Sequence, residues 1–401
     1  MNEIHIPQGG SLRLNEDEIS VLSSTFKNIG VDISCIDFNQ GIVSFPQAYV
    51  GYISLPGRKI IINPKHEGVT FKHILRIYYF LYTSDSSDLD EPIYDVDAEK
   101  SYDIIQNFVH ELEIVTKKGL PVEYKNRRNT LQYLRGNINL TNTALNVKLG
   151  KKEIFDCEYD ELSHDVPINQ VLYKALKKAA QMVDLGTGSL LSKSFHDVSE
   201  VFEVPQNIQL NTNTKYCKKV MTLAYMILND LSISDYGNST YGQNLLINFD
   251  RVFEEFIKKI LTVYSGDYNF TYWDDEKTYA LCRTHDSEFF KSYIPDMLYG
   301  YQSKSFPNTA YCILDMKNKT SKPFSNADVY QMFFYANQLK SKKVILCYPA
   351  SKNISNALLS FENEDFSIRK IYAAYINIAG NTSKDFKNNI YSFIENVKNL
   401  L

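Results

Sequence analysis

Hydrophobic positions near the start of the chain follow the pattern of short strands and turns. Two apolar runs within residues 49–65 meet at Pro56-Gly57, which predicts a β-hairpin. Apolar residues then recur at helical spacing and predict a helix from about Thr70 to Tyr82. We therefore expect residues 1–100 to form a β-rich N-terminal domain.

Helical patterns dominate the next part of the chain, residues 101–241. A helix is predicted from Ser101 to Lys118, and Gly119 is suited to end it. Further helices are predicted at Asn169–Val183, Tyr216–Leu231 and Gln243–Tyr264. The region also carries a basic stretch, formed by Lys117, Lys118, Lys125, Arg127, Arg128 and Arg135. It could follow a phosphate backbone, contact an acidic partner, or be an ordinary charged surface.

After Tyr264 the pattern changes to strands that alternate with helices. The predicted helices cover Asn326–Leu339 and Asp385–Leu400, and the predicted strands are Tyr268–Tyr272, Phe289–Ile294, Ala310–Leu314 and Lys343–Tyr348. This alternation indicates an α/β domain over residues 242–401. The fold class expected for the whole chain is thus multidomain and mixed α+β and α/β.

Composition narrows the class of protein further. The 401 residues are 44% hydrophobic and 22% charged, and their formal net charge is −4. No global positive field marks a nucleic-acid binder, so any contact with DNA must come from a local surface. The start of the chain lacks signal-peptide character and no window is apolar enough to span a membrane, so we expect a cytoplasmic protein.

Two carboxylates and a lysine lie at the ends of predicted neighbouring strands. Asp296 follows Pro295 at the end of one strand, and Asp315-Met316-Lys317 ends the next. Metal-dependent phosphodiester cleavage needs such a set, because carboxylates hold Mg²⁺, which polarises the phosphate and lowers the pKa of a bound water. The lysine can orient that water or stabilise the developing negative charge.

The pattern Asp-x-Lys is short enough to arise by chance. It also occurs at Asp275-Glu276-Lys277, which precedes the Pro-Asp pair, and at Asp385-Phe386-Lys387, on the polar face of the last helix. Only the pair at Asp315 and Lys317 follows an apolar strand at a suitable distance after Pro295-Asp296.

Two further features support the same interpretation. Gln331 and Tyr335 lie one helical turn apart and share a helix face. Upstream, Glu254 borders the apolar face of a predicted helix and is preferred over Glu255 because it directly follows Phe253. A surface glutamate and a core tyrosine are ordinary alternatives for each residue alone.

The ordered set of Glu, Pro-Asp, Asp-x-Lys and Gln-x-x-x-Tyr resembles the PD-(D/E)xK nuclease superfamily, and its last element resembles the RecB-type branch. More narrowly, the chain resembles the McrC family, the nuclease subunits of McrBC-type modification-dependent restriction systems. The resemblance extends to other segments of the chain: Tyr49–Ile53, Ile62–Lys65, Gly119–Tyr124, Leu131–Gly136, Phe155–Glu161 and Pro167–Asn169.

The resemblance implies a role for each residue of the set. Asp296, Asp315 and Glu254 would be metal ligands for Mg²⁺, and Lys317 would be the catalytic lysine. Gln331 and Tyr335 would position the DNA or the lysine.

The resemblance also implies partners and a biological setting. The chain has no G-x4-G-K-[ST] phosphate loop, which fits a subunit that works with a separate AAA+ GTPase hexamer. That partner would bind GTP, residues 1–100 would bind the partner, and double-stranded DNA containing modified cytosine would be the substrate in prokaryotic phage defence. Two alternatives stay open: a nuclease subunit that serves recognition of an unmodified sequence, and a non-catalytic adaptor that only activates the GTPase.

Overall fold

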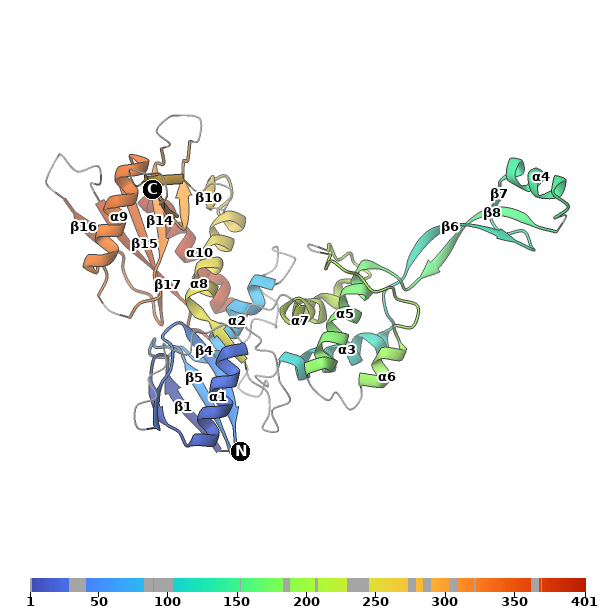
Figure 1. Ribbon diagram of the computed structural model, residues 1–401. Helices are drawn as coiled ribbons and strands as arrows, with labels where there is room; N and C mark the ends of the chain where they lie inside the picture. The colour runs from blue at the N-terminus through green and yellow to red at the C-terminus, as the bar shows by residue number, and fades with distance from the viewer. Residues whose placement is uncertain are drawn as a thin grey trace. The chain divides into compact units, whose positions relative to one another are not determined.

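The computed structural model describes residues 2–28, 41–82, 89, 104–151, 153–182, 188–205, 208–228, 245–272, 279–283, 290–302, 309–320, 322–361, 368 and 370–401. The chain divides into two compact units, which Figure 1 draws in ribbon form. One comprises Met1–Tyr102 together with Asp230–Leu401, and the other comprises Asp103–Asn229. The two ends of the sequence therefore share one folded body.

A four-stranded sheet forms the N-terminal part of the first unit. Its order is β1 (Asn2–Pro7), β5 (Arg58–Asn63), β4 (Tyr49–Leu55) and β9 (Leu245–Asn248), with only β1 and β5 parallel. The predicted hairpin is confirmed, because β4 and β5 pair across a turn in which Gly57 has a positive φ. The apolar face of the sheet packs with α1 (Glu16–Asn28) and with the small sheet of β2 (Ser11–Arg13) and β3 (Ile42–Ser44).

Strand β9 corrects one prediction from the sequence. The sequence predicts a single helix over Gln243–Tyr264, but residues 245–248 pair with β4 as a strand. Helix α8 (Phe249–Tyr264) begins only after Asn248, whose side chain accepts a hydrogen bond from the backbone N–H of Arg251. This asparagine cap separates two apolar runs that look continuous in the sequence.

A glycine permits the close pairing of β4 with β9. At Gly51 the backbone has a φ of +145°, and a Cβ atom there would lie 1.9 Å from the carbonyl oxygen of Leu245. Since no side chain fits at that distance, only glycine allows β9 to approach β4 at this point.

The second sheet of this unit has six strands. Their order is β10 (Phe270–Tyr272), β13 (Met297–Tyr299), β14 (Cys312–Met316), β15 (Lys343–Ala350), β17 (Lys370–Asn377) and β16 (Ala357–Ser360). The three central strands β14, β15 and β17 are parallel, and the outer pairs are antiparallel. A further hairpin, β11 (Tyr279–Arg283) with β12 (Phe290–Tyr293), forms a separate sheet.

Helices pack on both faces of the six-stranded sheet. Helix α9 (Asn326–Leu339) connects β14 to β15 and packs with Ile313, Val344 and Leu346. The alternate residues Ile345 and Cys347 are buried toward the other face, where α8 contacts β14 and α10 (Ser383–Leu400) contacts β17. Helix α2 (Phe71–Tyr82) packs against α8. Helix α8 itself contacts strands of both sheets.

The second unit contains a helical part. It consists of α3 (Ile104–Lys118), α5 (Pro167–Met182), α6 (Gly188–Lys193), a short 3-10 helix (Lys215–Cys217) and α7 (Lys218–Leu228). Predicted helices therefore occur here at close to the expected positions, and α3 ends at Gly119 as expected. No helix in the described parts of the chain is both long and apolar enough to cross a membrane.

A three-stranded sheet with one helix extends from the helical part, and we call this segment the arm (residues 123–163). It contains β6 (Glu123–Leu131), β7 (Asn137–Ile138), α4 (Leu140–Lys148) and β8 (Phe155–Ser163), with β8 between the other two strands. These strands were not predicted from the sequence, because most side chains of β6 and β7 are exposed. Without a buried face, a strand shows no alternation of apolar and polar residues.

Candidate active site

Asp296 and Asp315 lie opposite each other on neighbouring strands. Strand β13 pairs with β14 antiparallel, with Met297 beside Leu314, which brings the preceding Asp296 next to Asp315. Asp296 Oδ2 accepts a hydrogen bond of 2.8 Å from the backbone N–H of Met316. The expected juxtaposition thus occurs, although Asp296 stands at the start of β13 and does not end the strand predicted at Phe289–Ile294.

Lys317 connects Asp315 to the helix that carries the glutamine and the tyrosine. Its Nζ lies 2.5 Å from Asp315 Oδ2 and donates a hydrogen bond of 3.0 Å to Gln331 Oε1. Gln331 Nε2 in turn donates to the Tyr335 hydroxyl at 2.9 Å. The residues of the predicted Asp-x-Lys and Gln-x-x-x-Tyr motifs therefore form one continuous chain of contacts.

Glu254 belongs to the same site through α8. Its negative charge is one of the influences that raise the pKa of both Asp296 and Asp315, so its carboxylate lies within electrostatic range of them. Its Oε1 accepts a hydrogen bond of 2.6 Å from Lys258 Nζ, one helical turn further along α8. Lys258 was not predicted from the sequence, although a lysine four residues after Glu254 on a helix is placed to contact it.

The site concentrates buried charge. Burial and the charges of Asp315 and Glu254 raise the pKa of Asp296 to about 7, although the N–H of Met316 and the charge of Lys317 act in the opposite direction. Burial also raises the pKa of Asp315, which is 1% exposed. Neighbouring carboxylates that share a dry site resist ionisation unless a cation joins them.

The donor set fits a divalent cation. Asp315 Oδ2 is buried and close to Lys317, yet it receives no hydrogen bond of proper geometry in the structure. Neighbouring carboxylates, one buried and one half-buried, with an oxygen whose contacts are incomplete are suitable ligands for Mg²⁺. Asp296 and Asp315 could hold the ion directly, and Glu254 could join them by leaving Lys258. Among the described residues, no three side chains of the His, Cys, Asp or Glu type already stand together as a metal-binding group.

The other Asp-x-Lys sequences lie apart from this arrangement. Asp385 is part of the capping box of α10, where it accepts from the backbone N–H of Thr382. Asp275-Glu276-Lys277 lies outside the described residues. Of the two Asp-x-Lys sequences that the structure describes, it brings Asp315 and Lys317, and not Asp385 and Lys387, into contact with the other predicted site residues.

The basic stretch of the second unit is largely paired with acidic residues. In the arm, Arg127 and Arg135 both contact Glu161, while Arg128 contacts Asp156. At the base of the arm, Lys125 Nζ lies 3.0 Å from Asp165 Oδ2. These pairs favour an ordinary charged surface over a surface for the DNA backbone, because positive charges with neighbouring carboxylates attract phosphates weakly.

Comparisons with known proteins identify the family of this chain. Residues 46–349 match the family model described as McrBC 5-methylcytosine restriction system component. The fold is similar to a chain of the refined half-complex from the tetradecameric assembly of Thermococcus gammatolerans McrB AAA+ hexamers with bound McrC. The TM-score is 0.53 and the sequence identity 14%, and the match covers 98% of this chain and 100% of that one. A chain of the cryo-EM structure of the Thermococcus gammatolerans McrBC complex gives a TM-score of 0.42 and 15% identity, over 67% of this chain and 89% of that one. No curated protein sequence matches the chain.

Proposed function

Because the chain belongs to the McrBC 5-methylcytosine restriction system component family, we propose that it is the subunit that cleaves DNA in such a system. The observation that carries this proposal is the contact chain from Asp315 through Lys317 to Gln331, beside the half-buried carboxylate of Asp296, whose pKa is raised to about 7. A structural ion pair would not need a second neighbouring carboxylate that is unfavourable when ionised.

Each residue has a distinct task in this proposal. Asp296, Asp315 and Glu254 would hold Mg²⁺. When bound, the ion would polarise the phosphate and lower the pKa of a coordinated water. Lys317 orients the attacking water and stabilises negative charge that develops on the phosphate. Gln331 holds the Lys317 ammonium, and Tyr335 orients the Gln331 amide. Cleavage is then a displacement at phosphorus with departure of the 3′ oxygen.

The proposal includes a separate NTPase partner. The similar structure contains McrB AAA+ hexamers with bound McrC, and this chain has no phosphate loop of its own. We propose that an AAA+ GTPase hexamer binds this chain, that the chain stimulates its GTP hydrolysis, and that the partner delivers the nuclease to DNA. Whether the recognised DNA carries modified cytosine depends on the partner, so an unmodified target remains the alternative.

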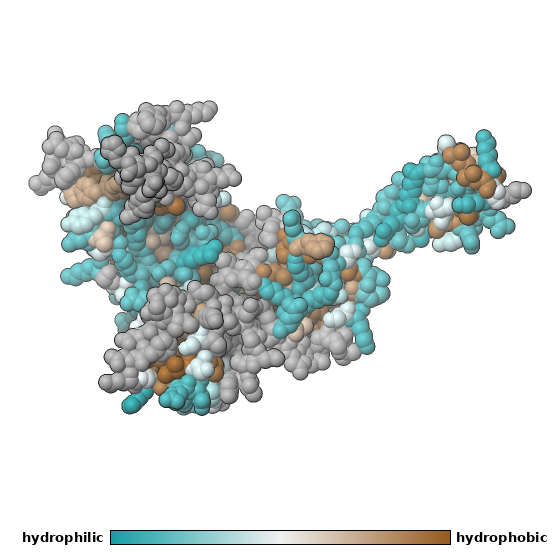
Figure 2. All heavy atoms as spheres, viewed as in Figure 1, coloured by the Kyte–Doolittle hydropathy of each residue, from teal (hydrophilic) through white to brown (hydrophobic). Residues whose placement is uncertain are grey.

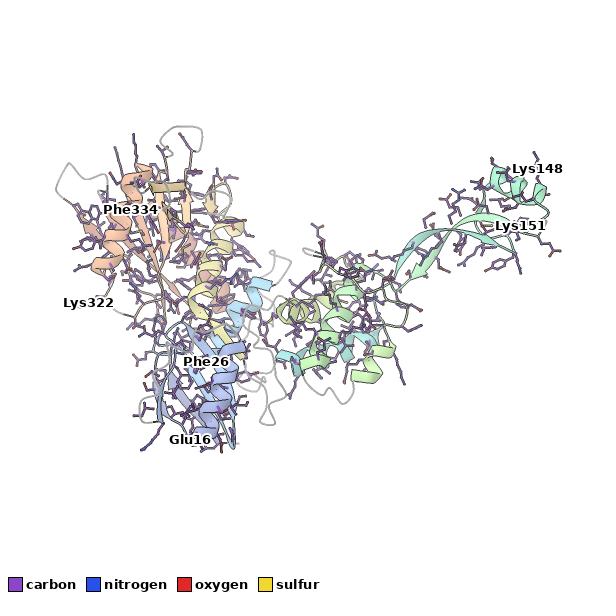
Figure 3. The ribbon with its side chains drawn as sticks, viewed as in Figure 1. Glu16, Phe26, Lys148, Lys151, Lys322 and Phe334 are labelled. Atoms are coloured by element: carbon purple, nitrogen blue, oxygen red, sulfur yellow. The ribbon has the colours of Figure 1, made fainter. Side chains whose placement is uncertain are left out.

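The arm offers a surface for that partner. At its end, α4 has no buried residue, and Leu140 and Leu149 are 76% and 73% exposed. Figure 2 shows hydrophobic atoms gathered at this end of the arm, and Figure 3 labels Lys148 and Lys151 beside them. Exposed apolar side chains grouped at one place usually mark a protein interface. The N-terminal region, residues 1–100, remains a second proposed surface for the partner.

Substitution of the lysine tests the nuclease site. We expect Lys317→Met to lower DNA cleavage by a factor of about 10²–10³, because one transition-state contact of this type contributes that much. The matched control is Lys322→Met, which removes an exposed lysine from the loop between β14 and α9 (Figure 3). Equal cleavage by the wild type and Lys317→Met in the presence of the partner would overturn the assignment.

A further inference from the structure

A loop of the N-terminal sheet contacts the residue that follows the predicted catalytic lysine. His66, three residues after β5, is 7% exposed. Its Nε2 lies 2.7 Å from Oδ1 of Asn318, a residue 252 positions away in the sequence. Asn318 directly follows Lys317, so the N-terminal part of the chain reaches the site at its lysine.

The Asn318 amide also contacts the helix that carries Glu254. Asn318 Nδ2 donates a hydrogen bond of 2.7 Å to Oδ1 of Asp250, one helical turn before Glu254 on α8. The preceding residue of α8, Phe249, packs edge-on against the His66 ring, with centroids 6.3 Å apart. His66 therefore contacts both structural elements that the amide joins.

The direction of these hydrogen bonds is fixed. An ionised aspartate can only accept, so Asp250 requires the NH₂ group of Asn318 to face it. The amide oxygen then faces His66, which must carry a proton on Nε2 to donate. Burial lowers the pKa of His66 below its ordinary value, which favours the neutral ring with its single N–H on Nε2.

From these contacts we infer that His66 is a positioning residue of the nuclease site. Through Asn318 it fixes the segment that carries Lys317 relative to the helix that carries Glu254. The four-stranded sheet thereby becomes part of the catalytic unit and is not merely a separate platform for the partner. This inference rests on the proposed nuclease function, since it assigns His66 a role in that site.

Two properties of purified full-length variants test the inference. The first is binding of Mn²⁺ alone, measured by electron paramagnetic resonance titration, and the second is DNA cleavage with the NTPase partner. Outer partners of metal ligands typically contribute about 10–100-fold to metal affinity or activity. We expect His66→Leu to lose about tenfold in Mn²⁺ affinity and in cleavage rate, with KM for DNA unchanged.

Four further variants separate positioning from general stability. His66→Gln retains an N–H donor close to the Nε2 position. It should therefore restore Mn²⁺ affinity and cleavage to within about twofold to threefold of wild type, a smaller loss than the one expected for His66→Leu. Asn318→Ala should resemble His66→Leu, and the double variant should be no worse than either single one. His73→Leu is the matched control, because His73 is also buried in this region but bonds to Thr70 instead of Asn318.

The outcomes are distinct. The inference would be overturned, and the nuclease function left intact, by any one of three results. These are wild-type affinity and cleavage in His66→Leu, an equal loss in His73→Leu, and a failure of His66→Gln to restore either property. A wild-type chain that neither binds Mn²⁺ at Asp315 nor cleaves DNA with its partner would overturn the proposed function and this inference with it.

Discussion

At the scale of single residues, the half-buried carboxylate of Asp296 combines partial loss of water contact with repulsion from Asp315 and Glu254. Its pKa of about 7 means that the folded chain binds this proton more tightly than the unfolded chain does. The free energy of unfolding contributed by Asp296 is therefore largest below pH 4, and is lost as the pH rises through about 7. Above that pH, Asp296 is ionised in the metal-free site, and its negative charge lowers the stability of the fold.

Asp296→Asn should remove this dependence on pH. At pH 8 without divalent cations, we expect the variant to exceed the wild type in free energy of unfolding by about 1–3 kcal/mol. Mg²⁺ should stabilise the wild type and have little effect on the variant. Thermal or denaturant unfolding between pH 4 and 8 measures both effects, with Asp267→Asn as an exposed control. Parallel curves for the wild type and Asp296→Asn would contradict the electrostatic account.

The predictability of the site from sequence differs between its residues. Asp296, Asp315, Lys317, Gln331 and Tyr335 belong to motifs with a fixed order and spacing, and the structure brings them together. His66 has no such motif, because its partner Asn318 is 252 positions away and only the fold makes them neighbours. Lys258 was missed for another reason, since helices commonly carry lysine four residues after glutamate on an exposed face.

At the scale of elements, the pairing of β4 with β9 connects the N-terminal sheet to the site. β9 leads directly into α8, which carries Glu254 and Asp250. The strand is four residues long and its apolar run merges with that of α8, so periodicity alone cannot separate the two elements. β13 was missed for a similar reason, because its three residues are too few to show alternation.

Gly51→Ala tests this connection. The added Cβ would meet the Leu245 carbonyl oxygen, so we expect β9 to separate from β4 and the chain to lose about 2–3 kcal/mol of stability. Cleavage should fall because α8 loses its anchor. Gly57→Ala is the control: its Cβ would meet nothing within 4 Å, although its positive φ still costs about 1 kcal/mol. Equal unfolding midpoints for the two variants would argue against the close approach at Gly51.

The arm supports a separate prediction at this scale. Leu140→Asp combined with Leu149→Asp should weaken binding of the NTPase partner by at least about tenfold, because apolar anchors dominate interface energies. Stability of the chain should not change, since both side chains are exposed. Phe202→Asp alters another exposed apolar residue of the same unit and is the control. Unchanged partner binding by the double variant would leave residues 1–100 as the proposed surface.

At the scale of the whole molecule, the chain folds discontinuously. Its first unit contains both ends of the sequence, and the second unit is inserted between them. The sequence predicts three consecutive regions, because patterns along a chain reveal local elements and not which distant strands pair. Long-range pairs such as β4 with β9 are decided by packing of the complete fold.

Net charge is another property of the whole chain. At −4 the molecule has no general attraction for DNA, and Arg127, Arg128 and Arg135 of the arm contact carboxylates. If the proposed cleavage belongs to this chain, a partner must therefore bring the chain to its DNA substrate.

The measurement that tests the central claim is DNA cleavage by the chain assembled with its NTPase partner. Wild type and Asp315→Ala are compared with Mg²⁺ and GTP on modified and unmodified DNA, and GTP hydrolysis is followed in the same samples. The account predicts cleavage by the wild type only, with GTP hydrolysis retained in both. Full cleavage by Asp315→Ala would contradict this assignment. Stimulated GTP hydrolysis without cleavage of any DNA by the wild type would also contradict it, and would support a non-catalytic adaptor instead.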